Sequence, residues 1–241
     1  MIFDPSALRI TGRIKTAENP NSMVYNEATD RLFVGHKPSK STTVIRASTG
    51  QIVKSIPLGG IPEFPVTDEL SVFVNIEDKN EIVRIDAKTL AITGHFPLGS
   101  CEGPGGLAID QDHHRLFAAC DNKRMAIVNA ESGAVITTLP IGGSPDAAGF
   151  DAESHLAFSS NGDGSLTVIA AEGSDNYHVV KTVATEPGAR TMALDAKTHT
   201  IFLSTAKLGP PPAPTVANPH PPNHPTALPG TFKLLVVSPN L

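Results

Sequence analysis

The 241-residue sequence contains no tryptophan, only two tyrosines and only two cysteines. With so few large aromatic rings, the chain offers little on which nucleic-acid bases could stack. It also lacks any block of basic residues, and its formal net charge is −5, which excludes nucleic acid as the main partner. No apolar run approaches the roughly 18 residues that a membrane-spanning helix requires. No signal peptide is recognisable at the amino terminus.

Glycine and proline, by contrast, are plentiful, with 20 and 21 copies. They separate short apolar segments that are rich in β-branched residues, and no helical period competes with this pattern. Hydrophobic residues make up 40% of the chain and charged residues 18%, a balance typical of a globular protein. The composition therefore favours an all-β fold with many short strands.

A motif recurs about every forty residues along the chain. In each copy a proline precedes an aspartate or asparagine by six residues, and a hairpin and a polar turn follow. The pairs are Pro20 with Asn26, Pro62 with Asp68, Pro104 with Asp110, and Pro145 with Asp151, while a fifth copy has Ala189 before Asp195. Four later equivalent positions, Arg46, Asp86, Asn129 and Ala170, are spaced 40, 43 and 41 residues apart. Four short strands per unit at this period predict the blades of a β-propeller.

Each blade is a small antiparallel sheet with apolar residues on both faces, so blades must stack around an axis to bury them. We expect complete blades at residues 23–57, 65–98, 107–140 and 147–185, and a fifth, three-stranded blade at 191–238. Residues 1–241 would then form a single β-propeller domain with about five blades. Residues 8–15 match the fourth strands of the other units, so they could complete the fifth blade and close the ring. The alternative is part of a larger ring.

Several stretches resemble the YVTN-type, or YncE-like, β-propeller repeat proteins. They are the Gly-Gly-x-Pro joints, "VNIEDKNEIVRIDAKT", "GARTMALDAKTHTIFLSTA" and the closing "PGTFKLLVV". The resemblance covers the whole chain and implies a bacterial protein in the periplasm or outside the cell, with a ring of typically seven blades. This sequence has about two blades fewer and no leader. Functions suggested for the family range from scaffolding and ligand binding to lactonase-like activity in distant relatives.

The residue after each repeat proline is the best candidate for a binding position. In successive copies it is Asn21, Glu63, Gly105, Asp146 and Arg190. Because this position begins the innermost strand of each blade, the five residues should converge at the mouth of the central channel. Varied polar residues at one repeat position are what a binding site on a repetitive scaffold would show, although a hydrated channel lining would look the same. Glu102 and His36 complete the ligand-binding candidates.

The stretch "VNIEDKNEIVRIDAKT" places Glu77 and Asp78 between two apolar strands. Carboxylates favour hard cations, so this pair is a candidate metal site and a divalent cation is a candidate cofactor. The equivalent stretches "GHKPSKST", "CDNKR" and "NGDGS" are also polar, but they share no set of ligands. Since these residue types suit tight hairpins, the repeat favours an ordinary turn between the second and third strands.

Three further features have more than one interpretation. Cys101 and Cys120 should lie on the same face, as either a disulfide or two unrelated thiols. The segment 209–230, with nine prolines, interrupts the last blade as either a stiff flap over the mouth or a tolerated insertion. Three histidines occupy one repeat position, in the turn between the first and second strands on the face opposite the mouth. They are His114, His155 and His199. These histidines are interpreted as turn residues rather than a cluster, because the turns of successive blades should point apart.

Known catalytic signatures are absent from the sequence, including the G-x-S-x-G elbow, H-E-x-x-H and the Walker A loop. The leading hypothesis is a non-enzymatic, exported β-propeller that binds a small ligand or a protein partner at the channel mouth, with Arg190 pairing a ligand carboxylate. The alternative is a metal-assisted lactonase or lyase with a cation held by Glu63 and Asp146. A third hypothesis is an assembly module whose open edge pairs with another chain.

Overall fold

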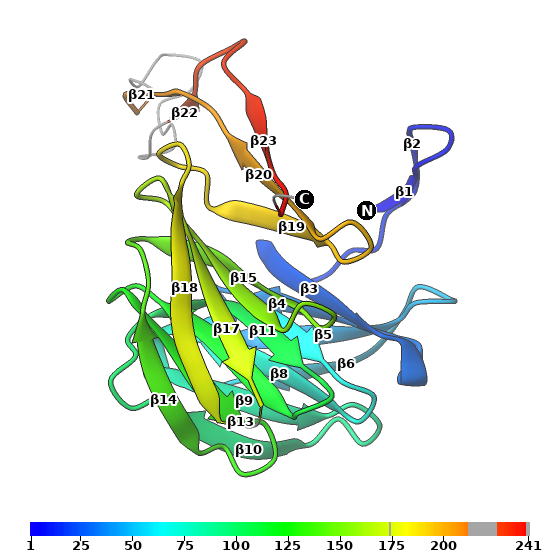
Figure 1. Ribbon diagram of the computed structural model, residues 1–241. Helices are drawn as coiled ribbons and strands as arrows, with labels where there is room; N and C mark the ends of the chain where they lie inside the picture. The colour runs from blue at the N-terminus through cyan, green and yellow to red at the C-terminus, as the bar shows by residue number, and fades with distance from the viewer. Residues whose placement is uncertain (174, 212–225, 240–241) are drawn as a thin grey trace.

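The computed structural model describes residues 1–173, 175–211 and 226–239, which form antiparallel sheets joined by turns (Figure 1). Blade 1 consists of β3 (Pro20–Asn26), β4 (Arg31–His36), β5 (Ser41–Arg46) and β6 (Gln51–Pro57). Blade 2 consists of β7 (Pro62–Thr67), β8 (Ser71–Ile76), β9 (Glu81–Asp86) and β10 (Ile92–Pro97). Blade 3 consists of β11 (Pro104–Asp110), β12 (Arg115–Cys120), β13 (Arg124–Asn129) and β14 (Val135–Pro140). Blade 4 consists of β15 (Pro145–Asp151), β16 (Leu156–Asn161), β17 (Ser165–Glu172) and β18 (Asn176–Ala184).

Blade 5 has three strands within the described residues, in the order β19 (Thr191–Asp195), β20 (Thr200–Thr205) and β23 (Lys233–Val237). Between β20 and β23, the short strands β21 (Leu208–Gly209) and β22 (Thr226–Ala227) pair at the base of the proline-rich segment. Most of that segment, residues 212–225, lies outside the described residues, so the expected flap over the mouth is a prediction that the structure does not test.

The blades are arranged around a common axis, with the first strand of each blade innermost (Figure 1). The first strands lie side by side in chain order, from β3 through β7, β11 and β15 to β19. This arrangement confirms the predicted β-propeller of about five blades. Blades 1 to 4 begin two or three residues before the predicted limits, since their first strands already pair at the repeat proline and then shift register.

The apolar core lies between the blades. At the interface of blades 1 and 2, Phe33 and Val44 pack with Val72 and Val83, and all four side chains are buried. Similar clusters fill the interfaces between blades 2 and 3, blades 3 and 4, and blades 4 and 5. Stacking therefore buries apolar surface on both faces of blades 2, 3 and 4, as the sequence pattern predicted.

The repeat aspartate caps the turn between the first and second strands. In blade 3 the Asp110 carboxylate accepts a hydrogen bond of 3.2 Å from the backbone N–H of His113. The next turn residue has a positive φ of 54°, 54° and 52° at His114, His155 and His199, respectively, which confirms their interpretation as turn residues. One part of that interpretation was wrong. His199 Nδ1 of blade 5 lies 2.6 Å from Asp151 Oδ2 of blade 4. The repeat aspartate of blade 4 therefore reaches the turn of the next blade, and the two turns do not point apart.

The amino-terminal strands β1 (Ile2–Asp4) and β2 (Arg9–Gly12) form a separate hairpin. The prediction that residues 8–15 could complete blade 5 and close the ring was wrong. In the described part of the chain, β2 pairs with β1, and β23 pairs with β20 alone. The local hairpin closes a loop of only a few residues, which costs less chain entropy than pairing with the distant β23.

Candidate binding site at the channel mouth

Four of the predicted site residues line one cavity of about 470 Å³ at the end of the channel. They are Asn21, Glu63, Asp146 and Arg190, and Gly105 of β11 lies among them. Three of the four side chains belong to the innermost strands β3, β7 and β15, and Arg190 directly precedes β19. The structure therefore brings together the polar residues that follow the repeat prolines, as the forty-residue period predicted.

A second set of side chains reaches the same cavity from the turns between the second and third strands. Lys37, Glu77 and Asp121 each follow the last residue of β4, β8 or β12. The sequence interpretation missed Lys37 and Asp121. The signal that could have found them is the same repeat logic, because the first residue after each second strand occupies one equivalent position.

Glu63 is held from two directions. Asn21 Nδ2 donates a hydrogen bond of 2.8 Å to Glu63 Oε2, and the Lys37 ammonium forms an ion pair with Glu63 Oε1. Lys37 Nζ also lies 3.6 Å from Glu77 Oε2. Burial raises the pKa of Glu63, and the ion pair with Lys37 opposes that rise. Although burial disfavours the charged ammonium, the contacts with Glu63 raise the pKa of Lys37.

On the other side of the mouth, Asp146 faces blade 5. Thr191 Oγ1 donates a hydrogen bond of 3.2 Å to Asp146 Oδ2, and Arg190 Nε lies 3.9 Å from Asp146 Oδ1. The Arg190 side chain is 53% exposed, so about half of it remains open to solvent.

Asp121 differs from the other mouth carboxylates. It accepts no hydrogen bond from any residue that the structure describes. Desolvation raises the pKa of its carboxyl group, and repulsion from Glu77 and Asp146 acts in the same direction, while Arg190 and Lys37 oppose it. Among the described lining residues, the mouth thus gathers four carboxylates and two cations, and the exposed Asp121 carboxylate has no direct partner among them.

The other candidate residues do not line this cavity. His36 is fully buried at the end of β4, where its Nε2 lies 3.0 Å from Thr43 Oγ1 and burial lowers its pKa. Glu102 is exposed in the joint before blade 3, and its backbone N–H donates to Asn122. Neither side chain is among the cavity-lining residues, because β4 turns His36 inward and the joint holds Glu102 outside the channel.

The Glu77–Asp78 pair is divided by its turn. Residues Glu77–Lys79 form a single 3-10 turn between β8 and β9, which confirms the hairpin interpretation. Asp78 accepts hydrogen bonds from the Ile61 N–H at 2.6 Å and from Lys40 Nζ at 2.7 Å, so it fixes the joint between blades. Glu77 alone reaches the mouth. Within residues 1–173, 175–211 and 226–239, no group of three or more His, Cys, Asp or Glu side chains is arranged to hold a metal ion.

Cys101 and Cys120 form a disulfide in blade 3, with their Cα atoms 5.6 Å apart. Both residues are fully buried behind the mouth-forming end of β12. The bond resolves the two interpretations that the sequence left open, and it ties the joint before blade 3 to the strand that precedes Asp121.

Comparisons with known proteins support the fold. The chain matches no protein-family profile and no curated protein. Among solved structures, it is similar to the β-propeller domain of Myceliophteria thermophila Cps50 (Swd1), with a TM-score of 0.70 and 8% identity over 84% of this chain and 72% of that one. It is also similar to a functionally unknown protein from Desulfotomaculum acetoxidans DSM 771, with a TM-score of 0.67 and 12% identity. That alignment covers 78% of this chain and 66% of the other.

These similarities define the class of protein. The chain is an all-β β-propeller with five blades, and its polar channel mouth is the candidate site. Identities this low establish the fold alone, so the resemblance to YVTN-type proteins stays a prediction. No helix in the described part of the chain is long and apolar enough to cross a membrane.

Proposed function

We propose that this β-propeller is a non-enzymatic binding protein whose channel mouth takes a small zwitterion, a molecule with an ammonium group and a carboxylate. One observation carries the proposal. Six charged side chains, contributed by all five blades and the joints between them, face a single cavity of about 470 Å³. Cavities with a few convergent polar groups are where proteins usually hold small ligands.

Asp121 is the natural partner for the ammonium group. Its carboxylate accepts no hydrogen bond within the described residues, and desolvation together with Glu77 and Asp146 raises its pKa. A ligand cation beside these three carboxylates would relieve their mutual repulsion and replace water at the exposed Asp121 carboxylate with charge-assisted hydrogen bonds. The side chains from blades 2, 3 and 4 would then share one positive charge.

Arg190 is the natural partner for the ligand carboxylate. Its side chain is half exposed, and its Nε lies 3.9 Å from Asp146 Oδ1, which leaves the planar fork of donors available. Arginine binds carboxylates through two parallel hydrogen bonds, and such charge-assisted pairs are stronger than neutral ones. Asp121 would thus bind the ammonium group of the ligand, and Arg190 its carboxylate.

The metal-assisted lactonase or lyase has less support. It required a cation held between Glu63 and Asp146, whereas Glu63 is bonded to Lys37 and Asn21, and Asp146 to Thr191. An ammonium beside Glu63 repels a metal ion at the same oxygen atoms. Within the described residues, no three His, Cys, Asp or Glu side chains are arranged to hold a metal ion, whereas an ammonium group needs only hydrogen-bond acceptors, so these carboxylates suit an organic cation better than a metal.

An oxidising location, periplasmic or extracellular, is part of the proposal. It is supported by the buried Cys101–Cys120 disulfide, since such bonds persist mainly in oxidising compartments.

Isothermal titration calorimetry with free amino acids tests the proposed site, with a diamine and a dicarboxylate as reference ligands. We expect an amino acid to bind more tightly than either reference ligand. Asp121→Asn should weaken binding by about tenfold, the cost of losing one charge-assisted hydrogen bond, and Arg190→Gln, which removes both hydrogen bonds of the arginine fork, should weaken it by about tenfold or more. Glu102→Gln removes a carboxylate on the same face outside the cavity and should change nothing. Equal affinity in all four proteins, or no binding of any amino acid, would refute the proposal.

A further inference from the structure

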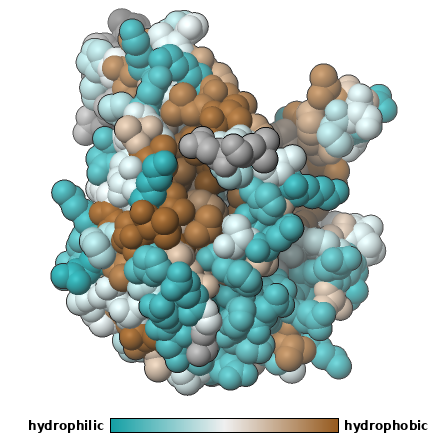
Figure 2. Space-filling view, in the orientation of Figure 1, coloured by the Kyte–Doolittle hydropathy of each residue, from teal (hydrophilic) through white to brown (hydrophobic). Residues whose placement is uncertain are grey.

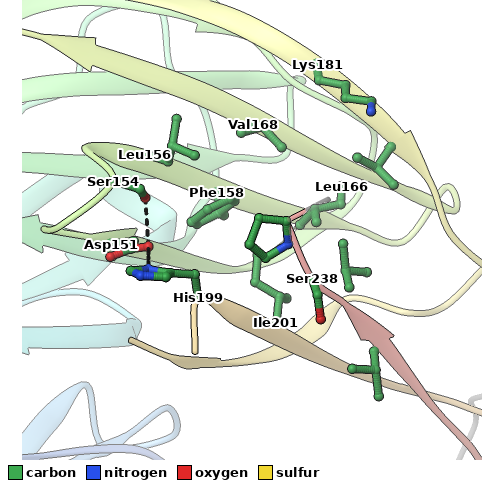
Figure 3. A pocket seen from close by; sticks show the side chains of 14 residues that line it. Asp151, Ser154, Leu156, Phe158, Leu166, Val168, Lys181, His199, Ile201 and Ser238 are labelled. Atoms are coloured by element: carbon green, nitrogen blue, oxygen red, sulfur yellow. Dashed lines mark hydrogen bonds and ion pairs between the residues drawn. The ribbon is translucent and has the colours of Figure 1, made fainter. Parts of the chain in front are cut away.

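A second cavity lies between blades 4 and 5 and shares no lining residue with the channel mouth. It has a volume of about 540 Å³, and its walls are mostly apolar. Figure 2 shows the apolar side chains gathered around the hollow between β23 and the strands β17 and β18. In Figure 3, Leu156, Phe158 and Val168 of blade 4 face Ile201 of blade 5 across this space.

The polar groups at one end of the cavity are already satisfied by one another. His199 Nδ1 lies 2.6 Å from Asp151 Oδ2, and Ser154 Oγ donates a hydrogen bond of 2.7 Å to the same oxygen (Figure 3). The cavity therefore offers mainly apolar surface to whatever fills it, which suits apolar side chains better than a charged molecule.

β23 borders the cavity, and in the described part of the chain one of its edges lacks a neighbouring strand. In blades 1 to 4, the third strand pairs with the second strand on one side and the fourth strand on the other. Within the described residues, β23 pairs only with β20, through residues Lys233–Val237. An unpaired strand edge presents a row of backbone donors and acceptors to which another strand can add.

The cavity lies where a fourth strand of blade 5 would place its side chains. In blade 2, Leu90 and Ile92, at the start of the fourth strand, pack back onto the core shared with blade 1. In blade 4, Tyr177 and Val179 of β18 pack in the same way onto blade 3. In the described part of the chain, the core between blades 4 and 5 contains side chains from the first three strands of blade 5 but none from a fourth strand.

The amino-terminal hairpin contains a strand of this type. The sequence "LRITGRI" from Leu8 to Ile14 matches "LAITGHF" from Leu90 to Phe96. Leu8 and Leu90 both have a positive φ, of 49° and 61°. The pairing of Phe3 with Ile10 repeats that of Ile85 with Ile92, each followed by a register shift.

The side chains that would pack against the preceding blade are exposed in this hairpin. Leu8 is 77% exposed and Ile10 is 46% exposed, whereas their equivalents Leu90 and Ile92 contact the core of blades 1 and 2. β2 thus has the sequence, backbone conformation and apolar face of a fourth strand, without a sheet against which to pack them.

We propose that the edge of β23 and the cavity beside it accept residues 8–14 of a second copy of this chain. In this exchange β2 leaves β1, pairs with β23 of the other copy as the fourth strand of its blade 5, and buries Leu8 and Ile10 in the cavity. The pairing given up is short, since β1 and β2 share three paired positions, whereas β23 has five residues along its edge. Reciprocal exchange produces a closed, two-fold symmetric dimer.

A second copy is favoured over the same chain because the hairpin is anchored to blade 1. Ile14, just after β2, lies against Gly50 in the turn between β5 and β6, where a Cβ on Gly50 would be 3.2 Å from the Ile14 side chain. This contact holds the segment on the opposite side of the open edge from β23. The exchange gives up this contact in each copy, but until then the contact keeps β2 away from the β23 edge of its own chain, which stays open to a strand from a second copy.

The mass of the full chain in solution, measured by light scattering over a wide range of concentration, tests the exchange. We expect a concentration-dependent dimer. The double substitution Leu8→Asp with Ile10→Asp should raise the dimer dissociation constant by about ten-thousandfold, roughly tenfold for each of the four buried apolar side chains that the two copies lose. The control Leu70→Asp changes a leucine of matching exposure, 76%, in a turn of blade 2 and should leave the dimer intact.

A synthetic peptide of residues 7–14 provides an independent measurement on the double variant, whose own β23 edge is unchanged. The peptide should bind it and slow amide hydrogen exchange along Lys233–Val237. Three results would overturn the proposal: a monomer at every concentration, a dimer that the double substitution leaves intact, or a wild-type monomer in which the β23 amides are already protected. The last result would show that a chain closes its own ring.

Discussion

Reduction of the Cys101–Cys120 disulfide should lower the free energy of unfolding by about 3 kcal/mol. The bond joins residues 19 positions apart, so it closes a loop of moderate length in the unfolded chain. The chain-entropy relation for a loop of that length gives about 11 cal/mol/K, or about 3 kcal/mol at room temperature. The bond also fixes the joint before blade 3 to the end of β12, next to Asp121. Its loss should therefore loosen the mouth as well as the blade.

The assay is urea unfolding, followed by circular dichroism, of the oxidised protein and of protein refolded in the presence of a reductant. The variant Cys101→Ala with Cys120→Ala is the control, because both cysteines are fully buried and alanine adds no polar group there. The reductant should shift the unfolding midpoint of the wild type and leave that of the variant unchanged. Identical midpoints for the oxidised and reduced wild type would refute the assigned role of the bond.

Three other predictions concern packing and pH. Gly106→Ala should destabilise the protein by about 1–3 kcal/mol, because the new Cβ would lie 2.7 Å from the backbone of β15. Gly105→Ala, where the nearest backbone atom is 3.6 Å away, should change stability by less than about 0.5 kcal/mol, and equal costs in urea unfolding would contradict the packing. Burial lowers the pKa of His36, so its protonation favours the unfolded state and stability falls as the pH drops below about 6.5. In thermal melts His36→Gln should flatten that fall, and an unchanged slope would exclude His36 as its source. The hydrogen bond to Asp151 raises the pKa of His199, so its stabilisation is complete below about 6.5 and is lost as the pH rises through the raised pKa. His199→Gln should therefore lower the melting temperature more at pH 6 than at pH 9, and a loss independent of pH would contradict the ion pair.

The fold and half of the mouth could be predicted from the sequence because both follow from the forty-residue period. A residue that directly follows a repeat proline must begin an innermost strand, so Glu63 and Asp146 were placed correctly. Lys37 and Asp121 were missed because the turns that contain them have several charged residues. Only the exact end of the second strand decides which of these points into the channel.

Contacts between blades were the least predictable part. Whether His199 reaches Asp151 depends on how closely two neighbouring turns approach, which no pattern within one repeat encodes. The pairing of β2 was also mispredicted. A sequence typical of a fourth strand indicates that it pairs with a third strand, but it does not indicate which one. The open edge of β23 was foreseen only in outline, as an edge that could pair with another chain.

The most direct test of the central claim is a map of backbone amide chemical-shift changes, measured by NMR while an amino acid is titrated into the protein. If the varied polar residues of all five blades form one binding site, the amides of Lys37, Glu63, Asp121, Asp146 and Arg190 should shift together with a single dissociation constant. Shifts confined to one blade, or to the cavity between blades 4 and 5, would contradict the account.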